Sequence, residues 1–570
     1  MSDRYKIILA EEIIKTNCIP SLIPEHCIEL LEMPNDSNLG DYALPCFNFS
    51  KTLKKNPQKI AEDLMNRMTL SSEFSEIKVI GGYLNFFLNK KLFIKDTLTE
   101  LLEKRENYYK LNIGNNETIL LEYSSPNIAK PFSVSHLRST NIGNALYKIL
   151  TFLGYHVIGI NHVGDWGTQF GKLIVAYKRW GSADFLKKDP IKNLFNLYVQ
   201  FHKEAETNPS LVDEAREVFK KMEEKDAALI DLWKWFTTVY LNDFKRIYDA
   251  LDVKFDHITG ESFYNNHVAS IIELLESKNI AKINEGALIV DLAAFDMPPL
   301  LVKKSDASSL YATRDLAALL YRKKEYKFSK ILYVVGSEQK LYFKQLFKTI
   351  ELLGFEWGKS CTHIDFGLFH FKDGKMASRT GNIVELEKVI TKAKELALQT
   401  INEKNPDLED KEIVAEKVAI GAIKFSDFSS KRIKDVLFDW NEMLRFDGET
   451  GPYLQYTNVR ILSLLRKYEK DIEDLDCEFS KLETIDEFLL VKELYNFRTI
   501  LVKAASEYEP YYIAKGLIDI AKRYNKFYTS HQILKVKKSI AEARIGLSYC
   551  THIILNLGLS LLGIQAPSQM

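Results

Sequence analysis

The spacing of hydrophobic positions changes near residue 118, where strand-like and helix-like segments begin to alternate. Thr118–Tyr123 is an apolar run of strand length, and Tyr155–Ile160 is a second one. Between them, after a loop that contains two prolines, apolar residues recur at helical spacing up to Gly154. A strand, a loop, a helix and a strand in this order form a βαβ unit, so the pattern predicts a parallel sheet.

The segments on either side follow other patterns. The N-terminal segment predicts a small α+β unit, with a helix near 56–68 and strands at Lys78–Ile80 and Tyr83–Leu88 around a Gly-Gly turn. Beyond a charged helical insertion, the apolar runs Ala287–Leu292 and Leu300–Val302 indicate that the β/α alternation resumes. The expected domains are 1–112, 113–384 with an insertion at about 185–285, a helical connector at 385–440, and a helical domain at 441–570.

Composition excludes several classes of protein. Of 570 residues, 46% are hydrophobic and 27% are charged, as in average soluble globular proteins, so wholesale disorder is excluded. The 77 Lys and Arg residues balance 77 Asp and Glu residues, which excludes a uniformly basic protein but still permits a locally basic face. At about 150 residues per domain, the length predicts roughly three or four domains.

The cysteines and the N-terminus bear on the compartment. The six cysteines lie far apart and include no C-x-x-C pair, which speaks against a structural zinc site and a disulfide framework and is typical of a reducing cytosol. Charged residues near the N-terminus interrupt any signal-peptide core, and no apolar run reaches the ~18 residues of a membrane span. We therefore expect a cytoplasmic protein without a membrane segment.

Two loops of the βαβ unit carry candidate chemistry. The loop after its first strand holds Lys130 and His136, which suit a phosphate at a helix N-terminus, although spacing alone favours an ordinary βα loop. The loop after its second strand holds His162 and Asp165 beside three glycines, and a turn capped by Asp165 explains it equally well.

A third candidate loop, 372–382, is basic and contains Lys375, Ser378 and Arg379. Cationic loops suit the charge that develops on a polyphosphate during its transfer. A basic surface turn is the alternative interpretation.

Together and in this order, these segments resemble the arginyl-tRNA synthetases, a family of class I aminoacyl-tRNA synthetases. The resemblance spans essentially the whole chain. It rests on SSPNIAKPF, HLRST, NHVGDWGTQFG, YATRD, VVGSEQ and GKMASRTGN, on NLGDYALPCF near the N-terminus, and on RFDGETGPYLQYTNVR and LLGIQAPSQM near the C-terminus. It implies an α/β catalytic domain with a Rossmann-like, doubly wound parallel sheet, a small N-terminal α+β domain and an all-α C-terminal domain.

The chain departs from the family's two ATP motifs. The first usually reads His-x-Gly-His, whereas Ser133-Val-Ser135-His136 stands here, and the serine in place of glycine adds bulk where a nucleotide packs closely. The second ends Lys375-Met-Ala-Ser-Arg379 rather than Lys-Met-Ser-Lys-Ser. In the family, a lysine just upstream of the first motif is thought to replace the missing one, and Lys130 holds that position.

The resemblance also implies the ligands and the residues that bind them. Arginine, tRNA(Arg) and ATP with Mg²⁺ are the expected ligands, and no protein-bound structural metal is expected. The residues expected at the reacting phosphates are Lys130, His136, Lys375 and Arg379. Further ATP contacts are expected from Ser133, Ser135, His136, Glu338, Met376 and Ser378. Arginine is expected to contact Glu122, Asn127, Tyr311, Asp315 and Gln339.

The proposed arginine contacts fit the chemistry of a guanidinium, which needs planar carboxylate partners and a group that covers its face. Glu122, Asp315 and Tyr311, one helical turn before Asp315, supply these groups, while Asn127 and Gln339 are implied to orient the α-amino and carboxylate groups. Without the resemblance, Asp315 is interpreted as the N-cap of the following helix. A pocket that pairs every guanidinium N–H rejects other amino acids strongly, so no editing domain is expected.

The C-terminal region carries a candidate RNA-binding segment. Residues 511–550 contain eight Lys and Arg residues and two acidic ones, a local net charge of +6, with six tyrosines and phenylalanines between them. Basic side chains and aromatic faces suit unstacked RNA bases, although a solvated helix face over a buried aromatic stripe is the alternative. By resemblance, this is the anticodon-binding domain, with Tyr524, Asn525 and Tyr528 as base contacts, while the N-terminal unit touches the tRNA elbow.

The leading hypothesis is an active arginine–tRNA ligase, which the family pattern implies to be monomeric and to need bound tRNA before it activates arginine. A catalytically weakened paralogue that binds tRNA or a partner protein is the alternative, and Ser133 with Ser135 is its only support. A ligase for another amino acid would have to explain two carboxylates in the pocket.

Overall fold

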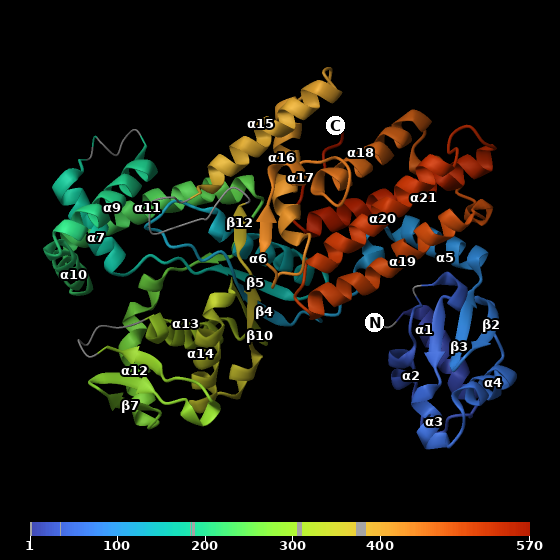
Figure 1. The fold of residues 1–570 in the computed structure, drawn as a ribbon, viewed down its shortest axis with the longest axis horizontal. Coiled ribbons are helices and arrows are strands. Elements are labelled where there is room, and N and C mark those ends of the chain that lie inside the picture. Colours follow the sequence, from blue (N-terminus) through green and yellow to red (C-terminus); the bar gives the residue numbers. More distant parts are fainter. Residues whose placement is uncertain (1–2, 35, 183, 185–188, 305–310, 372–383) are drawn as a thin grey trace. The chain divides into compact units, whose positions relative to one another are not determined.

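The computed structural model describes residues 3–34, 36–182, 184, 189–304, 311–371 and 384–570 (Figure 1). The chain forms two compact units. One unit comprises Met1–Leu111, Arg460–Ile500 and Gly516–Leu555, and the other comprises Asn112–Val459, Leu501–Lys515 and Asn556–Met570.

The second unit is built on a parallel sheet with the strand order β11-β10-β4-β5-β6. Its strands are β4 (Thr118–Glu122), β5 (His156–Asn161), β6 (His257–Ile258), β10 (Lys330–Gly336) and β11 (Cys361–Phe366). Helix α6 (Val134–Phe152) connects β4 to β5, as the apolar spacing predicts. The predicted βαβ unit and the doubly wound parallel sheet are therefore confirmed.

Strand β4 is buried on both faces, and the helix that follows it, α6, packs against one of them. Leu120 belongs to an apolar cluster with α13 (Tyr311–Tyr326) and α14 (Lys340–Leu352). Because successive strand residues point to opposite faces, Ile119 and Leu121 face the side on which α6 packs. A Cβ at Gly143 of α6 would collide with Tyr123, so glycine permits this close approach. The N-terminus of α6 is thereby held at the carboxyl edge of the sheet.

The insertion is helical, as expected, but the strand runs after it form a sheet of their own. Helices α7 (Thr168–Trp180), α9 (Pro190–Thr207), α10 (Ser210–Glu223) and α11 (Ala227–Ala250) come first, and α12 (Val268–Ser277) follows. The runs expected to continue the β/α alternation lie in an antiparallel sheet of β7 (Ala281–Asn284), β8 (Ala287–Val290) and β9 (Leu300–Lys303). The reason is the turn at Glu285 and Gly286, where both residues have positive φ and form a hairpin.

The region after residue 385 is largely helical, as the sequence predicts. Its helices are α15 (Leu386–Lys404), α16 (Lys411–Phe428), α17 (Trp440–Met443), α18 (Gly451–Tyr468), α19 (Ile485–Ser506), α20 (Tyr511–Ser530) and α21 (Lys538–Leu561). The pattern misses a short strand, β13 (Val436–Phe438), which pairs in parallel with β12 (Phe369–Phe371). Strand β12 ends where the basic loop 372–382 begins, and that loop lies outside the described residues.

The N-terminal segment forms the predicted small α+β fold. Its antiparallel sheet has the order β1-β3-β2, with β1 (Tyr42–Pro45), β2 (Phe74–Ile80) and β3 (Tyr83–Leu88). Its helices are α1 (Arg4–Lys15), α2 (Pro24–Leu30), α3 (Phe47–Leu53), α4 (Pro57–Arg67) and α5 (Lys90–Lys104). Among the described helices of the whole chain, none is long and apolar enough to cross a membrane.

Candidate active site

Most of the predicted site residues that the structure describes gather at the carboxyl ends of the parallel strands. The chain winds from β4 to β5 and β6 on one side and then continues with β10 and β11 on the other, so the strand order reverses between β4 and β10. Such a switch point is where open α/β sheets bind ligands. Two loops meet there: Ile128 N–H donates to the Gly164 carbonyl over 3.2 Å, and Gly164 N–H donates to the Pro126 carbonyl over 3.0 Å.

The loop after β4 has a strained backbone. Ser124 and Ser125 both have positive φ, at 70° and 44°, a left-handed conformation that costs energy in residues other than glycine. Ser124 N–H donates to Ser139 Oγ over 2.9 Å, and Ser125 N–H donates to Asn161 Oδ1 over 3.1 Å. Asn127 lies in the same loop and accepts the N–H of Ala129. The surrounding elements thus hold this loop in a conformation that it would not adopt alone.

The N-terminus of α6 offers hydrogen-bond donors to an anion. Ser133 is its N-cap residue, and Ser133 N–H donates to Nδ1 of His136 over 3.2 Å. Burial, and to a lesser extent the nearby charge of Lys130, lowers the pKa of His136 to about 4. The imidazole is therefore neutral at pH 7 and carries its proton on Nε2. A helix N-terminus with a neutral N–H donor suits a phosphate group.

Asp315 lies inside α13, in the part of the site that faces β5. The Tyr342 hydroxyl donates to its Oδ2, and Nε2 of His162 lies 3.8 Å from its Oδ1. Burial raises the pKa of Asp315 to about 6, against the effect of the Tyr342 hydrogen bond. Because α13 begins at Tyr311, the interpretation of Asp315 as an N-cap is wrong. Tyr311 itself is 57% exposed, at the start of the same helix.

Glu122, at the end of β4, already has a guanidinium partner within the protein. Arg322 of α13 is 1% exposed and donates from Nη1 to Oε2 of Glu122 over 2.5 Å. The hydroxyls of Tyr264 and Tyr333 lie 3.3 and 3.4 Å from the same guanidinium. The sequence analysis missed Arg322, because nothing near it in the sequence connects it with a residue two hundred positions away.

A further carboxylate, Glu261, was also missed. It follows β6, and burial raises its pKa to about 8, with the nearby Asp315 carboxylate adding to the rise. Its Oε2 is buried without a hydrogen-bond partner among the described residues, as are Ser125 Oγ, both ring nitrogens of His162, and Trp166 Nε1. Buried polar atoms nearly always have partners, so these atoms are available for hydrogen bonds to water or to a polar ligand.

The remaining predicted residues lie as follows. Glu338 and Gln339 are exposed in the turn that follows β10, and Lys130 is half-buried with its Nζ 5.9 Å from the centre of the Tyr198 ring. Lys375, Met376, Ser378 and Arg379 lie outside the described residues.

Comparisons with protein families match nearly the whole chain. A model described as "tRNA synthetases class I (R), catalytic domain" matches residues 97–440. Models described as "Arginyl tRNA synthetase N terminal domain" and "DALR anticodon binding domain" match 3–88 and 454–570. The chain belongs to the arginyl-tRNA synthetase family. This confirms the resemblance read from the sequence motifs.

Individual relatives of this family member agree over its full length. Arginine--tRNA ligase from Halothermothrix orenii is 47% identical over 97% of both chains, and that from Clostridium kluyveri is 46% identical over 99% of this chain and 100% of its own. The structures of arginyl-tRNA synthetases from Thermus thermophilus and Plasmodium falciparum superpose with a TM-score of 0.83 each at 24% identity. They cover 99% and 100% of each chain, and they show that the fold is shared.

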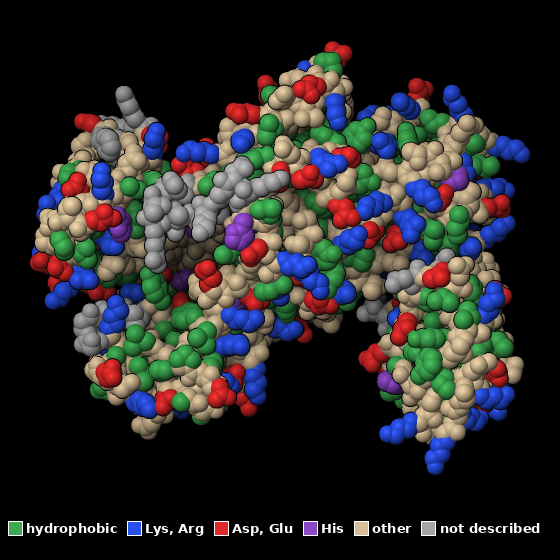
Figure 2. All heavy atoms as spheres, viewed as in Figure 1, with side chains coloured by type: hydrophobic (Ala, Val, Ile, Leu, Met, Phe, Trp, Pro, Cys, Tyr) green, Lys and Arg blue, Asp and Glu red, His purple; other side chains and the backbone are tan. Residues whose placement is uncertain are grey.

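Within this arginyl-tRNA synthetase fold, the basic segment 511–550 is more neutral than its sequence indicates. At least five of its eight basic residues form ion pairs with acidic side chains: Lys515 with Glu449, Arg523 with Glu493, Lys526 with Asp486, Lys538 with Glu542, and Arg544 with Glu487. Most of these partners come from outside the segment, so a count along the sequence misses them. In the face shown in Figure 2, Lys and Arg side chains are likewise mixed with Asp and Glu.

The three predicted base contacts differ in their accessibility. Tyr524 is fully buried, so its ring offers no face to a base in this conformation. Tyr528 and Asn525 are half-buried and meet Arg460, which lies 5.3 Å from the Tyr528 ring centre and donates to Asn525 Oδ1 over 2.5 Å. An aromatic ring, an amide and a guanidinium thus lie together on one surface.

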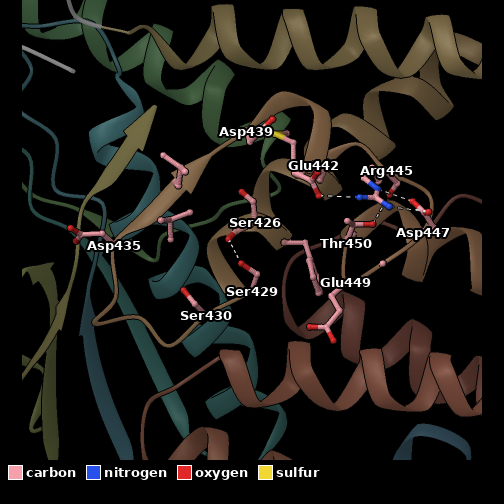
Figure 3. Close-up of a pocket in the computed structure, with 17 residues that line it drawn as sticks. Ser426, Ser429, Ser430, Asp435, Asp439, Glu442, Arg445, Asp447, Glu449 and Thr450 are labelled. Carbon is pink, nitrogen blue, oxygen red and sulfur yellow. Dashed lines mark hydrogen bonds and ion pairs between the residues drawn. The ribbon is translucent and has the colours of Figure 1, made fainter. Parts of the chain in front are cut away.

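A cavity of about 470 Å³ on the same unit as the parallel sheet has an acidic lining (Figure 3). Its charged residues are Asp435, Asp439, Glu442, Arg445, Asp447 and Glu449. Arg445 forms ion pairs with Glu442 over 3.3 Å and with Asp447 over 2.9 Å. We therefore do not expect phosphate groups of ATP or RNA to bind in this cavity.

The raised pKa of Glu261 predicts that arginine binds better at higher pH. In the free site Glu261 is protonated at pH 7, whereas a guanidinium needs the carboxylate, so binding releases a proton. We expect KM for arginine to fall roughly fivefold between pH 7 and pH 8 and to level off above pH 8. KM for ATP, measured over the same range, is the control, and Glu261→Gln should flatten the arginine profile. A flat profile in the unmodified protein would contradict this role of Glu261.

Proposed function

We propose that this protein joins L-arginine to tRNA(Arg) in two steps. In the first, the arginine carboxylate attacks the α-phosphate of ATP in line and pyrophosphate leaves. In the second, the ribose 2′-OH of the terminal tRNA adenosine attacks the arginyl-adenylate and AMP leaves. Such chemistry needs positioning and charge stabilisation rather than a protein nucleophile.

The observation that carries the proposal is the placement of two complementary subsites at one edge of the sheet. Carboxylates that suit a guanidinium lie at the end of β4 (Glu122), after β6 (Glu261) and in the first turns of α13 (Asp315), and a helix N-terminus that suits phosphate follows β4. An amino acid held by the first subsite can present its own carboxylate to a phosphate held by the second. Family membership and the relatives named arginine--tRNA ligase support the same reaction.

We assign the individual roles from this arrangement where the residues are described, and from the family resemblance for Lys375, Met376, Ser378 and Arg379, which lie outside the described residues. Asp315 and Glu122 hold the guanidinium, Tyr311 covers its face, and Asn127 and Gln339 orient the α-amino and carboxylate groups. His136 donates its Nε2–H to a phosphate oxygen, and Lys130, Lys375 and Arg379 supply positive charge. The further nucleotide contacts are Ser133, Ser135, Glu338, Met376 and Ser378.

Mg²⁺ that accompanies ATP would neutralise part of the charge on the phosphates. We propose that the ion arrives with ATP; among the residues that the structure describes, no group of three or more His, Cys, Asp or Glu is arranged to hold a metal. For the tRNA, we propose base contacts at Tyr528 and Asn525, and we retain the domain division of 1–112, 113–384, 385–440 and 441–570. The monomeric state and the cytoplasmic location also stay predictions.

The decisive measurement is arginine-dependent exchange between ATP and labelled pyrophosphate, with and without tRNA. We expect exchange with arginine and none with lysine or citrulline, and we expect it to need bound tRNA. The absence of exchange under both conditions would favour the weakened paralogue, for which the comparisons give no support.

A further inference from the structure

Among the contacts between the helical insertion and the strained loop after β4 is a hydrogen bond of one buried tyrosine, Tyr248. Tyr248, in the last turn of α11, is 4% exposed, and its hydroxyl oxygen lies 2.8 Å from Ser124 Oγ and 3.1 Å from Asn161 Nδ2. Ser124 begins the left-handed turn, and Asn161 ends β5. One side chain of the insertion therefore touches both loops that form the switch-point site.

The hydrogen bonds around Tyr248 have only one consistent direction. Asn161 Nδ2 can only donate, so the Tyr248 oxygen accepts from it, and the Tyr248 O–H donates to Ser124 Oγ because Ser124 uses its own proton on Thr140. At the other end, Thr140 Oγ1 donates to the His136 carbonyl over 2.7 Å and therefore accepts from Ser124 Oγ over 2.8 Å. A single chain of donors thus runs from β5 through α11 and the loop to the first turns of α6.

This chain holds the backbone that carries the proposed arginine contacts. Ser124 follows Glu122 by two residues and precedes Asn127 by three, and Asn161 directly precedes His162. Asn161 uses its other amide atom, Oδ1, to accept Ser125 N–H. Both left-handed residues are therefore tied, directly or through Asn161, to the hydroxyl of Tyr248.

We propose that Tyr248 is a positioning residue for arginine, whose hydroxyl ties the helical insertion to the loop that binds the substrate. The inference rests on the proposed function, because it assigns a part in arginine binding. Displacement of α11 would remove one of the hydrogen bonds that hold the left-handed turn, and also the hydrogen bond between Tyr248 and Asn161. The insertion and the proposed arginine subsite are thus linked through the Tyr248 hydroxyl.

The test is Tyr248→Phe, which keeps the ring and its edge contacts with Phe132 and Phe255 but removes the hydroxyl. We expect KM for arginine in the exchange reaction to rise about tenfold, and KM for ATP to change by less than about threefold. The matched control is Tyr240→Phe in the same helix. The Tyr240 hydroxyl is buried without a partner among the described residues, so its loss should change neither KM.

A second substitution separates positioning from a general loss of packing. Glycine adopts the left-handed conformation without strain, so Ser124→Gly removes the need for Tyr248 to hold it. The double variant Y248F/S124G should therefore have an arginine KM close to that of S124G alone. If Y248F does not fold, Ser124→Ala removes the same hydrogen bond from the loop side and should raise the arginine KM selectively.

Two results would overturn the proposal: equal behaviour of Y248F and Y240F, or independent, multiplicative effects of Y248F and S124G. Exchange by the unmodified protein is measured alongside. Its absence would count against the proposed function, whereas its presence with an unaffected Y248F would count against the positioning role alone.

Discussion

Replacing Asp315 by asparagine should raise KM for arginine about a hundredfold while KM for ATP stays within about threefold of its original value. The carboxylate is half-buried beside His162 and Tyr342, so if it were lost, only a little water could replace it as a partner of a bound guanidinium. Loss of one partner from a buried charge pair costs ~3 kcal/mol or more, which corresponds to roughly a hundredfold in affinity. The exchange reaction, titrated separately with arginine and with ATP, measures both constants.

Tyr342→Phe is the matched control for Asp315→Asn. It removes the hydroxyl that donates to Asp315 Oδ2 but leaves the carboxylate charge, so a rise in arginine KM of about tenfold or less is expected. Parallel increases in both KM values for Asp315→Asn would remove Asp315 from the arginine subsite. An arginine KM that is unchanged would do the same.

The fold could be predicted from the sequence wherever local pattern decides the structure. The apolar run at Thr118–Tyr123 became β4, because a strand that is buried on both faces leaves a continuous apolar run, and the helical spacing of apolar residues before Gly154 became α6. The run Ala287–Leu292 was placed in the wrong sheet, since a two-residue turn, rather than the run itself, decides its partner. Strand β13 has only three residues and leaves no period to detect.

Only those site residues that lie within sequence motifs could be predicted. Glu122 and Asp315 came from the family resemblance, whereas Arg322, Glu261 and Tyr248 act through contacts across the fold that no local spacing encodes. Tyr524 was predicted to contact a base but is buried, because an aromatic residue of a basic helix can face either the core or the solvent. The local net charge of +6 is likewise partly neutralised, because acidic residues of neighbouring helices form ion pairs with the basic ones.

Arg138, two residues after the end of the first ATP motif at His136, makes a further set of contacts that motifs do not reveal. Arg138 is 1% exposed; it donates from Nε to Asp427 Oδ1 of α16 over 2.8 Å and from Nη1 and Nη2 to the carbonyls of Lys434 and Arg432 over 2.9 and 3.0 Å. Those carbonyls precede β13, which pairs with β12. One buried guanidinium thus joins the helix of the first motif to a strand pair of which one strand, β12, directly precedes the second motif.

Arg138→Ala should therefore destabilise this unit by about 3–5 kcal/mol, because it leaves Asp427 as an uncompensated buried charge. Burial already raises the pKa of Asp427, and Arg138 is the nearby charge that opposes the rise. The measurement is hydrogen exchange of the amides of α6 and α16, which reports local opening rather than unfolding of the whole chain.

Arg179→Ala, which breaks the exposed Arg179–Glu214 pair, is the control and should cost less than ~1 kcal/mol. The double replacement Arg138→Met with Asp427→Leu removes both charges, so it should protect α6 better than Arg138→Ala does. Equal costs at the buried and exposed sites would show that Asp427 does not depend on Arg138.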